Sequence, residues 1–239
     1  MRISTSLKSI VFCLAAPICC TIASAATITF SSVGTATDPN ESVTLAPGTP
    51  GSGGILVCPG STPCTANTIA IDQHPFWASP LPGSSWISYG VTGNPADPGY
   101  FVVPNGEVET FTETFFVSGT PTSGSIQVMS DDSTSVSLNG VLLMAEASQV
   151  GNKYTVCSDF PITCTTPTTI DLTSALQPGL NVLTFGLAQR NLVSYGLDYV
   201  GTVNSSNGSG PGVPEPASMV LLGSGLMGLG VAKRRKAKQ

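Results

Sequence analysis

The sequence predicts an all-β protein whose main domain, residues 26–202, is a two-sheet β-sandwich between an N-terminal signal peptide and a C-terminal transmembrane helix. Three observations predict the sandwich. Helical periodicity is almost absent from this region, short β-branched or aromatic runs recur along it, and clusters of Gly, Pro, Asn and Asp separate the runs. Many short strands with turn signals between them are typical of sandwiches.

Ten segments have the composition of strands. They are residues 27–33, 42–46, 84–90, 99–104, 109–117, 124–130, 133–144, 168–172, 181–188 and 195–201. The clearest is 133–144, where Val136 and Leu138 alternate with serines and Asn139-Gly140 follows. Because Asn-Gly accepts the two positive φ angles of a type I′ turn, this segment is predicted to be a β-hairpin.

The second half of the domain resembles the galactose-binding-like jelly-roll modules. The resemblance rests on Asp131-Asp132-Ser133, on Leu138-Asn139-Gly140 and on Pro178-Gly179-Leu180-Asn181, and it covers roughly residues 105–202. It implies a jelly-roll-like sandwich. Some members of that family bind sugars, but these residues form turns and therefore indicate the fold more than a ligand.

The N-terminus has the features of a secretory signal peptide. Arg2 and Lys8 precede an apolar run, Ile10–Ile22, and the small residues Ala23-Ser24-Ala25 supply a cleavage site. We therefore assign residues 1–25 to the signal peptide. An uncleaved N-terminal anchor is the alternative.

The C-terminus predicts a membrane segment. Ala217–Ala232 contains no charged residue, and five basic residues follow within 233–238, which favours a cytoplasmic location for the tail and an external one for the domain. Gly223, Gly225 and Gly228 match the dinucleotide-binding spacing, but no acidic residue follows them, so small residues packing in a membrane helix explain them better.

Residues 213–239 resemble the PEP-CTERM sorting domain. Val213 and Pro214-Glu215-Pro216 precede the glycine-rich apolar stretch and the basic cluster in the order of that family. The resemblance implies a Gram-negative-type bacterium, an inner-membrane intermediate, cleavage by an exosortase-type enzyme, and delivery to the cell surface or to an exopolysaccharide matrix. An ordinary C-terminal anchor is the alternative. Residues 203–212, rich in Gly, Ser and Asn, are predicted to be a flexible linker.

Charge argues against nucleic acid as a partner. Residues 26–212 hold thirteen acidic residues and two basic ones, a formal charge of −11. A body this acidic repels phosphate and anionic membrane surfaces.

Four cysteines remain after the signal peptide, and an exported chain favours disulfides. They are Cys58, Cys64, Cys157 and Cys164. Three connectivities are open, and we favour the local pairs Cys58–Cys64 and Cys157–Cys164, each of which closes a short loop that contains proline.

Candidate ligand-binding residues are Tyr100, Asp131, Asp132 and Asn139. The two aspartates, with Asn139 or backbone carbonyls, offer the oxygen ligands that calcium prefers, although an Asx-type turn explains them equally simply. No other cofactor is expected. Among the aromatics of residues 77–100, we expect Trp77 and Trp86 in the core and Tyr100 as the most exposed member.

No catalytic residues are predicted. His74 has no Gly-x-Ser-x-Gly partner motif and is expected to pack beside Phe76 in a loop. We therefore expect a non-catalytic surface or matrix protein with exopolysaccharide as a candidate partner. The alternatives are a carbohydrate-binding module, with or without calcium, and a secreted glycoside hydrolase or esterase.

Overall fold

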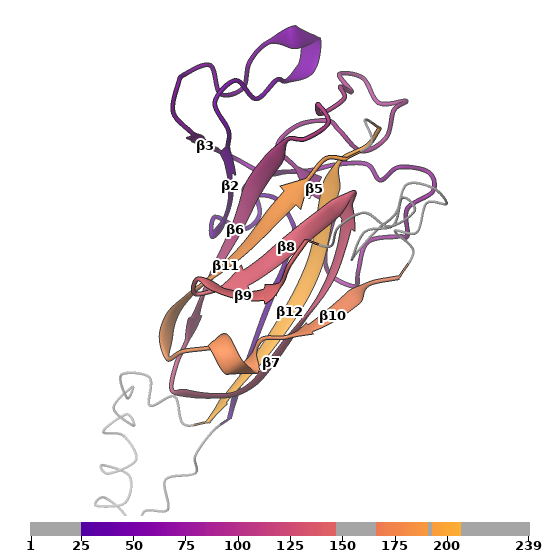
Figure 1. The fold of residues 1–239 in the computed structure, drawn as a ribbon. Helices are drawn as coiled ribbons and strands as arrows, with labels where there is room; N and C mark the ends of the chain where they lie inside the picture. The colour runs from indigo at the N-terminus through magenta and orange to yellow at the C-terminus, as the bar shows by residue number, and fades with distance from the viewer. Residues whose placement is uncertain (1–24, 147–165, 191–192, 207–239) are drawn as a thin grey trace, which may run out of the picture.

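The computed structural model describes residues 25–146, 166–190 and 193–206, and these form two antiparallel sheets packed face to face (Figure 1). The first sheet contains β1 (Ala26–Ser31), β4 (Ile69–Ala70), β5 (Ile87–Ser88), β7 (Thr120–Asp131), β10 (Thr168–Asp171) and β12 (Gly196–Ser206). The second contains β2 (Glu41–Leu45), β3 (Cys64–Ala66), β6 (Val108–Val117), β8 (Ser133–Leu138), β9 (Val141–Met144) and β11 (Gly179–Ala188). Two 3₁₀ turns, η1 (Ser52–Gly54) and η2 (Thr173–Ala175), complete the described elements.

The strand order is that of a jelly roll. Numbered along the chain, β1, β6, β7, β8, β9, β10, β11 and β12 become strands 1 to 8. The first sheet then has the order 1-8-3-6 and the second the order 2-7-4-5. Apart from the β8–β9 hairpin, consecutive strands of this set lie in different sheets, as in the two Greek keys of a jelly roll. The short strands β2 to β5 are additions at the sheet edges. The prediction of a jelly-roll-like sandwich is confirmed.

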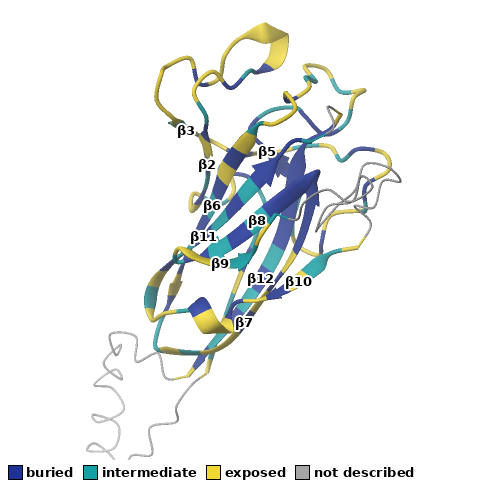
Figure 2. Ribbon diagram, viewed as in Figure 1, coloured by how far each residue is buried: buried dark blue, intermediate teal, exposed yellow. Residues whose placement is uncertain are grey.

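The core lies between the sheets, where the buried residues of the long strands meet (Figure 2). Along β6, Phe111, Glu113 and Phe115 are buried, whereas the intervening threonines are only half buried, so the strand alternates with period two. The Phe30 and Phe115 rings stack 4.4 Å apart and join the two sheets. Fully burying such side chains stabilises the fold by about 1.5–3 kcal/mol each.

The predicted hairpin is present between β8 and β9. Asn139 and Gly140 have φ values of 53° and 79°, the left-handed pair that a type I′ turn needs. Leu138 pairs with Val141 across the turn.

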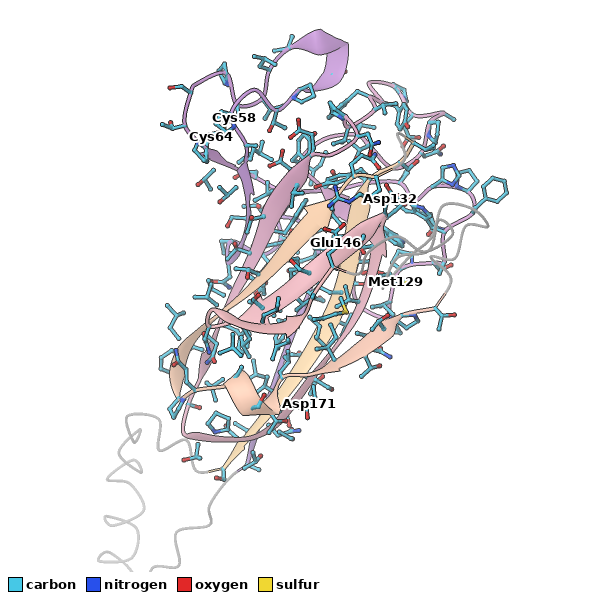
Figure 3. All side chains as sticks on the ribbon, in the orientation of Figure 1. Cys58, Cys64, Met129, Asp132, Glu146 and Asp171 are labelled. Carbon is cyan, nitrogen blue, oxygen red and sulfur yellow. A yellow bond between two sulfur atoms is a disulfide. The ribbon has the colours of Figure 1, made fainter. Side chains whose placement is uncertain are left out.

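A long excursion between β2 and β3 projects from the sandwich at the end remote from the start of β1 and the end of β12 (Figures 1 and 3). It contains η1 and the disulfide Cys58–Cys64, whose Cα atoms lie 5.8 Å apart. This pairing is the local one that the sequence favoured. Cys157 and Cys164 lie outside the described residues.

Two sequence-based boundaries need correction. Residues 99–104 form no strand; the amide of Phe101 bonds only to the Val91 carbonyl, and a proline follows at position 104. The interval 203–212 is not wholly a linker, because β12 continues to Ser206. The last residues of β12 pair with both β1 and β7. Their polar composition alone did not indicate that they belong to a strand.

The predicted signal peptide and sorting tail lie outside the described residues, apart from Ala25. Within the described part of the chain, no helix has the length and hydrophobicity to cross a membrane.

Candidate functional site

Asp131 and Asp132 lie where the chain crosses from one sheet to the other. Asp131 is the last residue of β7 and pairs with Gly196, the first residue of β12. Ser133 begins β8 and pairs with Ala188 at the end of β11. Both aspartates are buried, with exposed fractions of 8% and 2%. The crossover therefore places two adjacent carboxylates at the end of the sandwich that is remote from Ser206, the end of β12 (Figure 3).

Trp77 holds Asp131 in place. The indole Nε1 donates a 2.9 Å hydrogen bond to Asp131 Oδ2 in a buried setting. The ring can lie close to β12 because position 196 is glycine: a Cβ there would come within 3.0 Å of the indole. Trp77 also packs on Trp86, with ring centroids 4.2 Å apart. A loop residue and a strand end are thus fixed together.

Asp132 is fixed by the segment after β11. Its Oδ2 accepts a 2.6 Å hydrogen bond from the backbone amide of Arg190. The Arg190 guanidinium pairs with the Glu146 carboxylate through Nε and Nη2, at 2.7 and 2.6 Å. Glu146 follows β9, so this ion pair fastens the second sheet beside Asp132 (Figure 3).

Tyr100 lies near the aspartates but is not an open platform. It is half buried, and its hydroxyl donates a 2.7 Å hydrogen bond to the Val193 carbonyl. Burial raises the pKa of Tyr100; a hydrogen bond with Ser194 partly opposes this, and the negative charge of Asp131 adds to it. The structure therefore brings Tyr100, Asp131 and Asp132 to one end of the sandwich.

Asn139 does not join this group, which corrects the sequence-based expectation. It lies at the far end of β8, six residues or about 20 Å of extended chain away. Its Nδ2 donates to Ala175 and Asn181 oxygens, and its Oδ1 accepts from the Val182 amide. Asn139 thus ties the hairpin turn to β11, a structural role.

The aromatic residues of the loops belong mainly to the core, as expected for both tryptophans. Trp77 and Trp86 are 5% and 0% exposed. Tyr89 is also buried, and its hydroxyl has no hydrogen-bond partner among the described residues. Phe76, at 65%, is more exposed than the half-buried Tyr100.

His74 has the structural role that the sequence indicated. Its ring packs 5.3 Å from Phe76 and 6.1 Å from Trp77, and Nδ1 accepts the Phe76 amide. Burial lowers the pKa of His74, which favours the neutral imidazole.

Sequence reasoning missed several buried carboxylates on strands of both sheets. Tyr199 donates its hydroxyl to Glu113 Oε2 at 3.0 Å, and Glu113 pairs in register with Glu41. Burial, then the charge of Asp38, raises the pKa of Glu113 to about 8 against the opposing hydrogen bond from Tyr199. Burial likewise raises the pKa of Glu41, Glu109 and Asp198.

These carboxylates could have been found from the sequence. In "ETFTETFFV", the two glutamates and the first two phenylalanines share one face of an alternating strand. That pattern places Glu109 and Glu113 in the core.

A cation at Asp131 and Asp132 would need further ligands. Among the described residues, no group of three or more His, Cys, Asp or Glu side chains is arranged to hold a metal ion. Calcium takes roughly six to eight oxygen ligands. The two carboxylates fit part of such a shell, and backbone carbonyls and water would supply the remainder.

The described residues thus define a jelly-roll sandwich with two buried aspartates at its loop end. Comparison with protein-family models finds the PEP-CTERM protein-sorting motif at residues 212–236, which confirms the sorting tail predicted around Pro214-Glu215-Pro216. The motif marks a secreted protein that an exosortase-type enzyme processes and that is anchored in the membrane before release. No curated protein matches the chain.

Proposed function

We propose that this chain is a non-catalytic protein of the cell surface or extracellular matrix that associates with exopolysaccharide. The observation that carries the proposal is the sorting motif at residues 212–236, attached to a jelly-roll domain. Strands of both sheets hold the loops at one end of the sandwich in place. The domain can therefore present a fixed binding surface, and this role needs no catalysis.

The experiment for this function follows the protein and its partner together. Cells expressing the full chain are fractionated, and the extracellular polysaccharide is isolated and probed for the protein. We expect the processed protein to co-purify with polysaccharide and to be released when the polysaccharide is digested. Processed protein that remains free of polysaccharide at all protein concentrations would contradict the association.

A second candidate function is specific glycan binding assisted by calcium at Asp131 and Asp132. The observation that favours it is the adjacency of two buried carboxylates beside Tyr100. A bound cation would offset the cost of burying the two negative charges.

Calcium binding is tested by thermal unfolding with and without calcium. We expect the ion to raise the unfolding temperature of the full chain, and Asp131→Asn with Asp132→Asn to remove that rise. Each asparagine keeps an oxygen for the Trp77 or Arg190 N–H donor. Asp171→Asn, on the exposed edge strand β10, is the matched control. An equal rise in the double variant would exclude this site.

The enzyme alternative has its own test. Turnover of a glycoside or ester that disappears on replacing Glu113 or His74 would overturn the non-catalytic proposal. Equal rates in the wild type and both variants would point to a contaminant.

A further inference from the structure

A hollow of about 430 Å³ opens beside β4 and β5, next to the Trp77–Trp86 stack. Its size lies within the range of small-ligand pockets. Ala70, Ile71 and Pro80 line its apolar part, and Asp72, Gln73, Ser85 and Asn94 line its polar part. Trp86, which is fully buried, borders the hollow from the inside.

The polar side chains retain unused hydrogen-bonding groups. Asp72 makes no side-chain hydrogen bond or ion pair with any described residue, and neither does the Ser85 hydroxyl. Asn94 uses Oδ1 to accept the Ala96 amide at 3.0 Å, which leaves its NH₂ group as a donor. Gln73 donates to the Trp77 carbonyl and keeps its own carbonyl oxygen. The hollow therefore offers both donors and acceptors.

The backbone around the hollow is held firmly. The Ile71 amide bonds to the Trp86 carbonyl at 2.8 Å, and the Ser85 amide bonds to the Ser32 carbonyl at 2.7 Å. Gly93 packs so closely on the Asp72 carbonyl that a Cβ would lie 2.1 Å from it. Contacts between three separate loop segments thus fix the backbone around the hollow, so the hollow is preformed.

The charge of the hollow selects the ligand. Its one ionisable group is Asp72, and the described residues contain a single lysine or arginine, Arg190, which pairs with Glu146. Among the described residues, none offers a free base to offset the repulsion that Asp72 would exert on an anionic ligand. A small apolar floor with mixed donors and acceptors suits a neutral ring that carries several hydroxyl groups.

We propose that the hollow formed by Asp72, Ser85, Trp86 and Asn94 binds one neutral sugar ring of a polysaccharide chain. This inference rests on the proposed association with exopolysaccharide and names the place on the domain where the polysaccharide binds. The Asp72 carboxylate accepts from ring hydroxyls, and the Asn94 amide donates to a neighbouring oxygen. The Trp77–Trp86 stack joins this site to the aspartates at the sheet crossover.

The test measures binding of the full chain, purified in detergent, to neutral glucan, galactan and mannan and to an anionic polyuronate. We expect affinity for at least one neutral polymer and none for the polyuronate. Asp72→Asn and Asn94→Asp should each weaken that affinity about tenfold, the effect of losing one hydrogen bond to or from a ligand. The Asn94→Asp change keeps an oxygen that accepts the Ala96 amide, so the turn survives.

Asp97→Asn is the matched control. It makes the same chemical change as Asp72→Asn, and Asp97 lies on the loop of Asn94 but outside the hollow. It should leave affinity within twofold, and all variants should keep the wild-type unfolding temperature. Neutral-polymer binding that both hollow variants leave unchanged overturns this inference while the exopolysaccharide association stands. Preference for the polyuronate overturns it as well. Absence of binding to all four polymers and to the cells' own polysaccharide overturns both proposals.

Discussion

Glu113 lies in the core with a hydrogen bond from Tyr199 and with Glu41 opposite it on the neighbouring strand. Burial makes ionisation of Glu113 unfavourable, and the negative charges of Asp38 and of the paired Glu41 add to that cost. The pKa of Glu113 is accordingly raised to about 8. The protonated acid is the form that suits the folded state.

Stability should therefore fall as pH rises. The folded pKa of Glu113 exceeds its unfolded value of 4.5, so the folded state holds more protons between pH 4.5 and about 8. We expect the free energy of unfolding to be highest below pH 4.5, as far as this residue contributes, and to decline through about pH 8. The slope is at most about 1.4 kcal/mol per pH unit for one group.

Glu113→Gln should flatten this decline, because glutamine accepts the Tyr199 hydroxyl and carries no charge. Urea unfolding at pH 5 and pH 8.5 measures both proteins, and Glu107→Gln, outside the core, serves as control. Equal slopes in the wild type and Glu113→Gln would show that the residue ionises without cost.

The β8–β9 hairpin depends on backbone geometry at its turn. Gly140 has a φ of 79°, and a Cβ added there would meet nothing within 4 Å. The requirement for glycine is thus conformational and not steric. Asn139 supports the same turn by bonding to Ala175, Asn181 and Val182.

Gly140→Ala should lower the free energy of unfolding by about 1–2 kcal/mol, the cost of a left-handed residue with a Cβ. Gly140→Asn should cost less, because asparagine tolerates this region. Chemical denaturation of the three proteins checks the order. Equal losses in both variants would indicate that side-chain contact, and not φ, governs the turn.

The Cys58–Cys64 disulfide closes a short loop at the C-terminal end of the excursion between β2 and β3, with Cys64 as the first residue of β3. Replacing both cysteines by serine should lower the free energy of unfolding by about 2 kcal/mol in the chain-entropy model. The strands of the sandwich should remain, as measured by circular dichroism. A further shift when the double variant is treated with reductant would reveal the predicted Cys157–Cys164 bond, and no shift would contradict that pair.

At the scale of the molecule, the candidate site and Ser206, the last described residue before the sorting motif, lie at opposite ends of the sandwich. β1 begins beside the end of β12, since Ala26 pairs with Ser205, and the tail continues from there. Asp131 pairs with Gly196 at the other end of β12. Ten steps along this strand span roughly 34 Å. A domain held through its C-terminus would therefore present the aspartates and the hollow away from its attachment point.

The sorting motif gives a prediction at this scale. Replacing Pro214, Glu215 and Pro216 by alanine should block processing, because alanines allow a helix where the prolines prevent it and remove the recognised carboxylate. Immunoblots of membrane and extracellular fractions should show the unprocessed chain retained in the membrane. The control replaces Gly208, Ser209 and Gly210 by alanine and should be processed normally. Equal processing of both variants would contradict recognition of the motif.

Features written in contiguous residues were predictable from the sequence. The all-β class, the Asn139-Gly140 turn, the Cys58–Cys64 pair and the sorting tail each depend on short-range patterns of hydrophobicity, φ preference or spacing. The buried position of Glu113 could also be predicted from the alternation along β6, although a charged side chain is not usually expected in a core.

Tertiary structure alone decided which distant residues meet. Pairing of β7 with β12 and of β8 with β11 brought Trp77, Tyr100 and Arg190 to the two aspartates and left Asn139 at the other end of β8. The hollow beside Trp86 is likewise lined by three segments that are separate in the sequence. Sequence states the local preference of each segment, whereas the crossing of the chain between two sheets fixes distances between residues a hundred positions apart.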